Sequence, residues 1–139
     1  MATIFRRLHR LRKLEERTAQ VALADAHAHK QTCEAEVVQL QSALDRSHRM
    51  AGSDVALMLC HHRFSLDGEL QRRTAVRALD EAVDTVQTAH GEMVHRAQQA
   101  RTVELLAEAV EEEQRTEARL SEQRMFDEVG TQRWLRRAS

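Results

Sequence analysis

The stretch that decides the fold is residues 76–110, which read VRALDEAVDTVQTAHGEMVHRAQQARTVELLAEAV. Apolar or small residues, with one histidine among them, recur along it every three or four positions, and this spacing predicts a long helix that packs through one face. The step of three from Ala100 to Val103 follows another step of three, which is typical of a coiled-coil stammer. The stripe consists of Val76, Leu79, Val83, Val86, His90, Met93, Ala97, Ala100, Val103, Leu106 and Val110.

A second stripe runs through the N-terminal part of the chain. Its mean step is about 3.6 residues, the period of a straight helix, so a second long helix is expected there. This stripe consists of Leu11, Leu14, Thr18, Ala22, Ala26, His29, Cys33, Val37, Leu40, Leu44 and Ser47.

The composition agrees with two long helices. The 139-residue chain has no proline and four glycines, and a helix interior tolerates proline least of all residues. Charged residues make up 31% of the chain and aromatic residues only 3%, so the helices can bury a narrow stripe but not a thick core. Since such a fold has little room for a concave pocket, we expect the protein to function by contact with other proteins.

Helix-breaking residues are concentrated in residues 51–68. Gly52 offers a helix stop, and Ser53 and Asp54 behind it are good N-cap residues. Residues 55–66 are mostly apolar and could form a short helix, and Gly68 marks a second break. The sequence predicts one elongated coiled-coil domain over residues 1–139, with a first arm at 1–50, a turn region at 51–68 and a second arm at 69–139. Which break makes the turn stays open.

A short connection favours an antiparallel all-α hairpin over a parallel homodimer. Matching large apolar residues across the two arms gives a register in which the numbers of facing residues total about 130. The expected facing pairs are Leu11 with Leu120, Val37 with Met93, and Leu44 with Val86.

Charge is unevenly distributed along the chain. Residues 1–13 carry five basic side chains and no acid, residues 104–122 are rich in glutamate, and residues 123–139 are again basic. If the chain folds back on itself, we expect the two termini to form one basic end, suited to an acidic protein surface, anionic lipid or nucleic acid.

Catalytic and metal-binding motifs are scarce. No glycine-rich phosphate loop, nucleophile elbow or paired-acid arrangement occurs, so we expect no enzyme, no cofactor and no metal. Glu92 and His95 form a Glu-x-x-His motif that occurs once, whereas di-iron bundles need two. His29 and Cys33 could both reach a metal at their i, i+4 spacing, but packing in the stripe is the simpler interpretation.

The remaining features favour an intracellular protein. Cys33 and Cys60 match neither a disulfide framework nor a zinc spacing, and the basic N-terminus lacks the apolar segment of a secretory signal. The longest apolar run, 55–60, is too short to cross a bilayer. Residues 1–14 could lie on a membrane surface as an amphipathic helix, or close the end of the coiled coil. Nucleic acid is not an expected partner, because the zipper-like pattern lacks a separate base-reading helix.

Two terminal stretches resemble a known family. Residues 4–26, IFRRLHRLRKLEERTAQVALADA, and residues 121–137, SEQRMFDEVGTQRWLRR, are similar to the two ends of the FliJ family of the flagellar export apparatus. They are also similar to the YscO (SctO) counterparts in virulence type III secretion. The resemblance covers most of the chain.

The resemblance implies a non-enzymatic bacterial stalk protein. Its joined termini would enter the hexameric ring of the export ATPase and stimulate it, and its turn end would reach the membrane-embedded export gate. Some family members also bind secretion chaperones. The implied location is cytoplasmic, peripheral to the inner membrane, without stable membrane insertion. The alternative is an unrelated coiled-coil adaptor or tethering protein.

The resemblance also implies site residues. The ATPase-binding candidates are Arg6, Arg7, Arg10, Arg12, Arg124, Asp127 and Glu128. Residues 33–44, CEAEVVQLQSAL, place Gln39 at a position associated with gate binding, and Phe64 matches an aromatic residue of the second arm. Arg46 and Met50 stand where tyrosines are expected, which favours a virulence-type system over a flagellar one.

Overall fold

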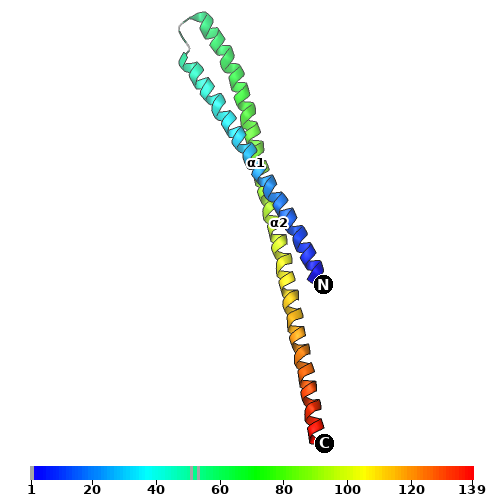
Figure 1. Ribbon diagram of the computed structural model, residues 1–139. Helices are drawn as coiled ribbons and strands as arrows, with labels where there is room; N and C mark the ends of the chain where they lie inside the picture. Colours follow the sequence, from blue (N-terminus) through cyan, green and yellow to red (C-terminus); the bar gives the residue numbers. More distant parts are fainter. Residues whose placement is uncertain (1, 51, 53) are drawn as a thin grey trace. The chain divides into compact units, whose positions relative to one another are not determined.

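The computed structural model describes residues 2–50, 52 and 54–139, and these form two helices (Figure 1). Helix α1 spans Ala2–Met50 and helix α2 spans Val55–Ala138. The two helices run antiparallel and pack against each other, which confirms the all-α hairpin.

The turn lies at the first of the two predicted breaks. Asp54 caps α2 as expected, because its Oδ1 accepts a hydrogen bond of 3.1 Å from the Ala56 N–H. The other predicted cap, Ser53, lies outside the described residues. Residues 55–66 are the first turns of α2, so the separate short helix is not formed, and α2 passes through Gly68 without a break.

The chain divides into two compact units. Unit 1 consists of Met1–Glu16 and Arg96–Ser139, and unit 2 consists of Arg17–His95. Each unit contains a piece of α1 and a piece of α2, and the two units are described separately below.

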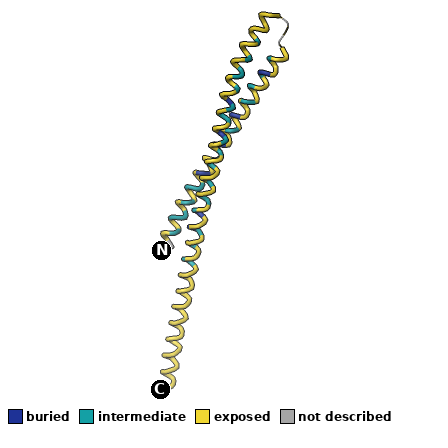
Figure 2. Tube along the Cα trace, turned by 180° about the vertical axis from the view of Figure 1, so that it is seen from behind, coloured by how far each residue is buried: buried dark blue, intermediate teal, exposed yellow. Residues whose placement is uncertain are grey.

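Small residues form most of the buried interface. Figure 2 shows where the buried positions lie along the two helices. Packing of small side chains lets two helix backbones approach closely and explains how a chain with few large apolar residues can form this pair. The buried apolar residues are Ala19, Ala26, Cys33 and Leu44 on α1, and Ala75, Ala82, Ala100 and Val103 on α2.

The predicted α1 stripe is correct in its second half and wrong in its first. Leu11 and Leu14 are 52% and 58% exposed. Half-buried Arg12 and Glu16 and buried Ala19 occupy the interface instead, in steps of four and three. The prediction followed the leucines, whereas the interface accepts the long stems of charged residues at this end. From residue 26 onward the stripe is confirmed at Ala26, Cys33, Val37, Leu40, Leu44 and Ser47, and His29 is exposed.

The α2 stripe is largely confirmed, but the stammer is not present. Arg96, Ala100, Val103 and Ala107 are buried or half-buried in steps of four, three and four, so the alternation continues without a slip. The prediction placed Leu106 in the stripe, and this residue is 49% exposed. The predicted stripe member His90 is also exposed.

The predicted register is wrong by about five helical turns. In unit 1, Arg96 Nη1 lies 3.5 Å from Glu15 Oε2, so the numbers of these facing residues total 111. In unit 2, Leu44 packs over Gly68 and not beside Val86. The interface is matched through small residues and ion pairs, whereas the prediction matched the largest apolar side chains. The expected pairs Leu11 with Leu120, Val37 with Met93, and Leu44 with Val86 therefore do not face each other.

Candidate functional site

The first candidate surface is the α2 extension, residues 112–139. Among the described residues of unit 1, the ion pair between Arg6 and Glu111 is the one nearest the start of α1, and every α2 residue from 112 onward is exposed (Figure 2). Three predicted ATPase-binding residues lie on this extension, namely Arg124, Asp127 and Glu128.

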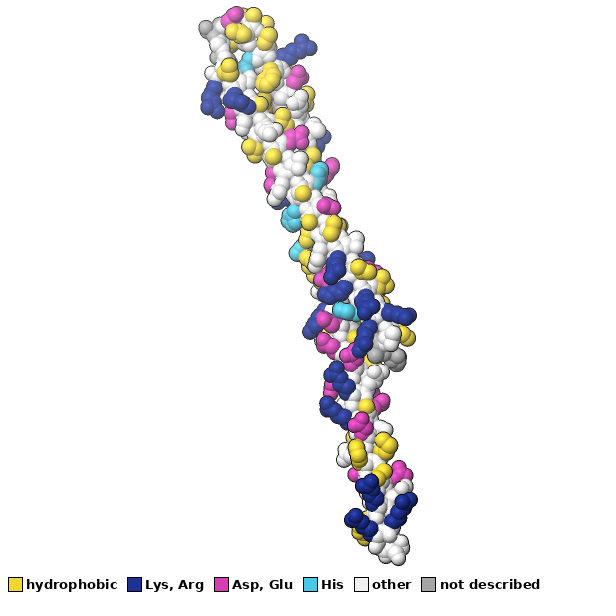
Figure 3. Space-filling view, in the orientation of Figure 1, with side chains coloured by type: hydrophobic (Ala, Val, Ile, Leu, Met, Phe, Trp, Pro, Cys, Tyr) yellow, Lys and Arg dark blue, Asp and Glu magenta, His cyan; other side chains and the backbone are white. Residues whose placement is uncertain are grey.

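The α2 extension also exposes large apolar side chains. Phe126 is 74% exposed and Trp134 is 68% exposed, and basic side chains gather near the end of the helix on the face that Figure 3 shows. Aromatic and arginine side chains of this kind are frequent in the centres of protein interfaces. The exposed apolar set is Leu120, Met125, Phe126, Val129, Trp134 and Leu135.

The two termini do not form one basic end. The start of α1 lies beside the acidic stretch 104–111 of α2, and the basic residues 124–137 lie farther along α2. The prediction of a shared basic end depended on the register, and it is wrong for the same reason.

Two of the N-terminal arginines, Arg6 and Arg12, form hydrogen bonds to residues of α2. The Arg6 guanidinium donates hydrogen bonds of 2.8 and 2.9 Å to Glu111, and Arg12 Nη1 donates bonds of 2.8 Å to Glu15 and 3.4 Å to Gln99. Arg6 and Arg12 therefore attach α1 to α2 within unit 1. The complementary charge of residues 1–13 and 104–122 was visible in the sequence and could have indicated this pairing.

Arg10 lines a small cavity, and Arg7 is exposed. The cavity, about 240 Å³, has basic groups on its α1 side and acidic groups on its α2 side. One of the latter, Glu104, has a lowered pKa, mainly because Arg101 donates a 2.6 Å hydrogen bond to it and secondarily through nearby positive charges. The cavity is lined by Arg6, His9, Arg10, Glu104, Ala107, Glu108 and Glu111.

The second candidate surface is the turn groove, a cavity of about 560 Å³ between α1 and α2 in unit 2. Ser47 Oγ and His61 Nδ1 form a 2.7 Å hydrogen bond across it, and the His48 and His61 rings are in edge contact with centroids 5.1 Å apart. Phe64, predicted as a gate-binding residue, lines this groove and is 51% exposed. The groove is lined by Ala43, Arg46, Ser47, Met50, Leu57, Cys60, His61 and Phe64.

Gln39 lies close to the turn groove along α1 but does not line it. Gln39 is exposed, and it precedes the groove residue Ala43 by four positions, which places both on one face of α1. Arg46 and Met50 continue this face, so the residues that replace the expected tyrosines are part of the groove wall. Leu57 also lines the groove, which was not expected from the sequence. Its place there depends on which of the two predicted breaks makes the turn.

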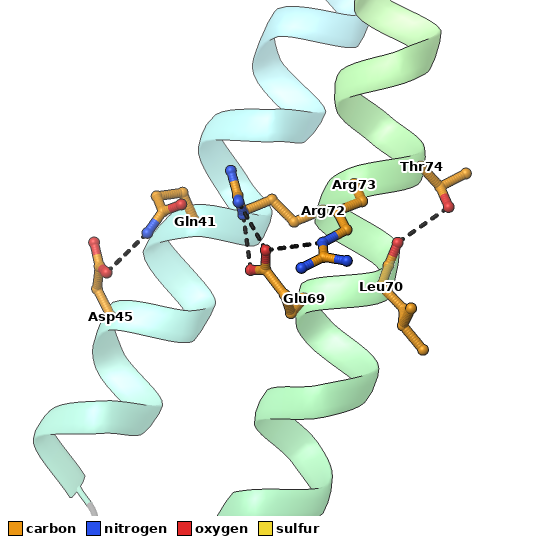
Figure 4. Close-up of polar contacts among 7 residues, drawn as sticks. All are labelled: Gln41, Asp45, Glu69, Leu70, Arg72, Arg73 and Thr74. Atoms are coloured by element: carbon orange, nitrogen blue, oxygen red, sulfur yellow. Dashed lines mark hydrogen bonds and ion pairs between the residues drawn. The ribbon is translucent and has the colours of Figure 1, made fainter.

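A polar cluster on α2 stabilises the helix near residue 70 (Figure 4). Arg72 donates hydrogen bonds of 2.9 and 2.8 Å to Glu69, and Arg73 adds one of 3.4 Å. These bonds, with that of Arg72 contributing most, lower the pKa of Glu69 to about 2. The arrangement is a network of i, i+3 and i, i+4 pairs on a solvated helix face.

Both cysteines are free thiols. Cys33 is buried, with its Sγ 3.7 Å from His29 Nε2, and Cys60 is an exposed free thiol. Among the described residues, His, Cys, Asp and Glu form no group of three that could hold a metal. Neither helix, as far as its described residues show, includes a stretch with the length and hydropathy needed to span a bilayer.

The fold and these surfaces define an antiparallel coiled-coil protein with exposed apolar and basic contact surfaces. The chain belongs to the FliJ family, since the family described as flagellar FliJ protein matches residues 1–139. We found no significant match among curated proteins or among solved structures.

Family membership implies a stalk component of the flagellar export apparatus. The alternative of an unrelated adaptor therefore does not hold. The match is to the flagellar family, and the virulence-type assignment stays a prediction.

Proposed function

We propose that the chain acts as one coiled-coil stalk domain that couples the export ATPase to the export gate. The α2 extension enters the hexameric ATPase ring and stimulates hydrolysis. The turn groove contacts the gate at the inner membrane, so that the protein works in the cytoplasm, peripheral to that membrane. Secretion chaperones are further partners that the family resemblance implies.

The exposure of every residue from 112 to 139 is the observation that best supports ring entry. A single helix is about 10–12 Å wide with its side chains, so it can enter an opening that would exclude a helix pair. Arg124, Asp127 and Glu128 lie on this helix together with the exposed ring of Trp134. Charged groups on such a helix favour orientation and fast association with an oppositely charged channel.

The N-terminal arginines also have a role in this proposal. Arg6 and Arg12 hold α1 against α2, so they position the start of the α2 extension. Arg7 and Arg10 are exposed near that point and are available for contact at the mouth of the ring.

The turn groove supports the proposed gate contact. An apolar side chain of the gate can insert between Met50, Leu57 and Phe64, and Arg46 can pair with an acidic neighbour. Gln39 lies on the same α1 face and extends the contact by one turn.

Hydrolysis by the cognate export ATPase, measured with and without the purified chain, tests ring entry. A variant with Arg124→Glu and Arg133→Glu should lose most of the stimulation and keep its helicity by circular dichroism. Arg77→Glu, at an exposed α2 position of unit 2, is the matched control and should stimulate like the original chain. Full stimulation by the double variant would contradict ring entry through the α2 extension.

Binding to the cytoplasmic part of the export gate tests the turn groove separately. Phe64→Ala should weaken binding, since truncating an aromatic side chain in an interface pocket typically costs about 1 kcal/mol or more. Val38→Ala is the control, because Val38 is an exposed apolar residue of α1 that does not line the groove. Equal binding by both variants would reject the groove as the gate contact.

A further inference from the structure

An uncharged stripe runs along the α2 extension. Six positions at a mean step of about 3.6 residues lie on one face of the helix and carry no charge, although charged residues are dense around them. The stripe consists of Gln114, Ala118, Ser121, Met125, Val129 and Gln132. It follows Ala107 and Val110, the half-buried residues through which α2 packs at its last contacts with α1.

Nothing in the described part of the chain covers this stripe. All residues from 112 to 139 are exposed, including Met125 at 61% and Val129 at 42%. From Glu117 to Arg137, moreover, the described residues form no ion pair among themselves. The helix therefore offers both an interface stripe and uncommitted charges to a partner.

The charges beside the stripe are arranged for a second copy of the same helix. At 100° per residue, Glu122 flanks one side of the stripe with Arg119 farther round the helix on that side, and Glu117 and Arg124 flank the other. In an antiparallel pair, each flank faces the same flank of the partner. A two-fold axis near Ser121 then sets Arg119 against Glu122 and Glu117 against Arg124, each twice by symmetry.

The stripe itself fits this arrangement. The same axis sets Met125 of one copy against Ala118 of the other, a large residue against a small one, and Gln114 against Val129. Ser121 meets its own symmetry mate. We propose that two copies of the chain associate antiparallel through residues 114–129 of their α2 extensions.

This dimer is weak and sensitive to salt. Sixteen residues of helix are about 24 Å long, so the buried area stays below the roughly 1,200 Å² of standard stable interfaces. The flanking ion pairs set the partner and the orientation, and they are screened as ionic strength rises. Because the pairing covers Arg124, and if ring entry uses the α2 extension as proposed above, the dimer must dissociate before the chain enters the ring.

Single-cysteine variants of the full chain, made with Cys33→Ala and Cys60→Ser, test the geometry without any ATPase. Ser121→Cys should form an intermolecular disulfide, whereas Leu120→Cys, on the opposite face, should not. A mixture of Ala118→Cys and Met125→Cys chains should give the mixed disulfide. A Met125→Cys chain that crosslinks mainly to itself would indicate parallel pairing and overturn the proposal.

Exchanging the charges beside the stripe tests independently whether the partner is a second copy of the chain. Sedimentation velocity at low salt measures the association. Arg119→Glu with Arg124→Glu should shift the dimer to monomer, and adding Glu117→Arg and Glu122→Arg should restore it. A chain that is monomeric at every concentration, or a fourfold variant that stays monomeric, would overturn the proposal. Both readouts concern the chain alone, so their failure is distinct from failure of the stalk function.

Discussion

Leu44 of α1 packs directly over Gly68 of α2. Leu44 is 5% exposed, and a Cβ atom at Gly68 would lie 2.6 Å from the Leu44 Cδ2 atom. The glycine therefore serves close approach of the two helices and not helix termination. This contact fixes the register of unit 2 at its end nearest the turn.

Alanine at two helical glycines should have different effects on stability. Gly91→Ala should stabilise the chain by roughly 0.5–1 kcal/mol, because the helix gains propensity and the new Cβ meets open space. Gly68→Ala should lose this gain, because Leu44 must move out of a packed position. Urea denaturation followed by circular dichroism measures both. An equal gain at the two positions would show that Leu44 does not pack on Gly68.

The ion pair between Arg6 and Glu111 should stabilise unit 1 modestly. Both side chains are partly exposed, at 65% and 28%, so a coupling energy of up to about 1 kcal/mol is expected from a double-mutant cycle. The exchanged variant, Arg6→Glu with Glu111→Arg, should recover part of the loss. Arg7→Glu with Glu111→Arg is the control and should recover nothing, since Arg7 makes no ion pair with Glu111 in the described structure.

Glu69 should titrate at an unusually low pH. Its pKa in the folded chain is about 2, below the ordinary 4.5, so its stabilising effect is fully present above about pH 4.5 and is lost as the pH falls through 2. Carboxyl NMR measures this titration directly. Arg72→Gln should raise the pKa of Glu69 more than Arg73→Gln does, because Arg72 donates the two shorter hydrogen bonds. The opposite order would contradict the geometry of this cluster.

The helices and the turn could be predicted from the sequence because each depends on local chemistry. The absence of proline allows long helices, and Asp54 caps α2 through a bond to a residue two positions away. The register could not be predicted in the same way. Alanines recur at heptad spacing on both arms, so shifts by whole heptads keep small residues in the interface, and the choice depends on contacts such as Arg6 with Glu111.

Some candidate site residues were identified correctly from the sequence, whereas the contacts of others depend on the register. Phe64 was identified by resemblance, and it lines the turn groove. Arg6 was expected to face a partner, but it pairs within the chain, because its neighbour depends on the register. Gly68 was interpreted as a break, since a sequence does not reveal that a large side chain from another helix rests on a glycine.

The most direct test of this account is the distance between spin labels at Arg7 and Arg133, two exposed positions of unit 1. Since Arg6 lies beside Glu111, Arg133 lies beyond the residue opposite Arg7 by roughly 23 residues of helix, about 35 Å along the axis. Double electron–electron resonance should therefore give a distance of roughly 35–45 Å. A distance of roughly 20 Å would mean that the two termini lie together, and it would contradict the α2 extension on which both proposals rest.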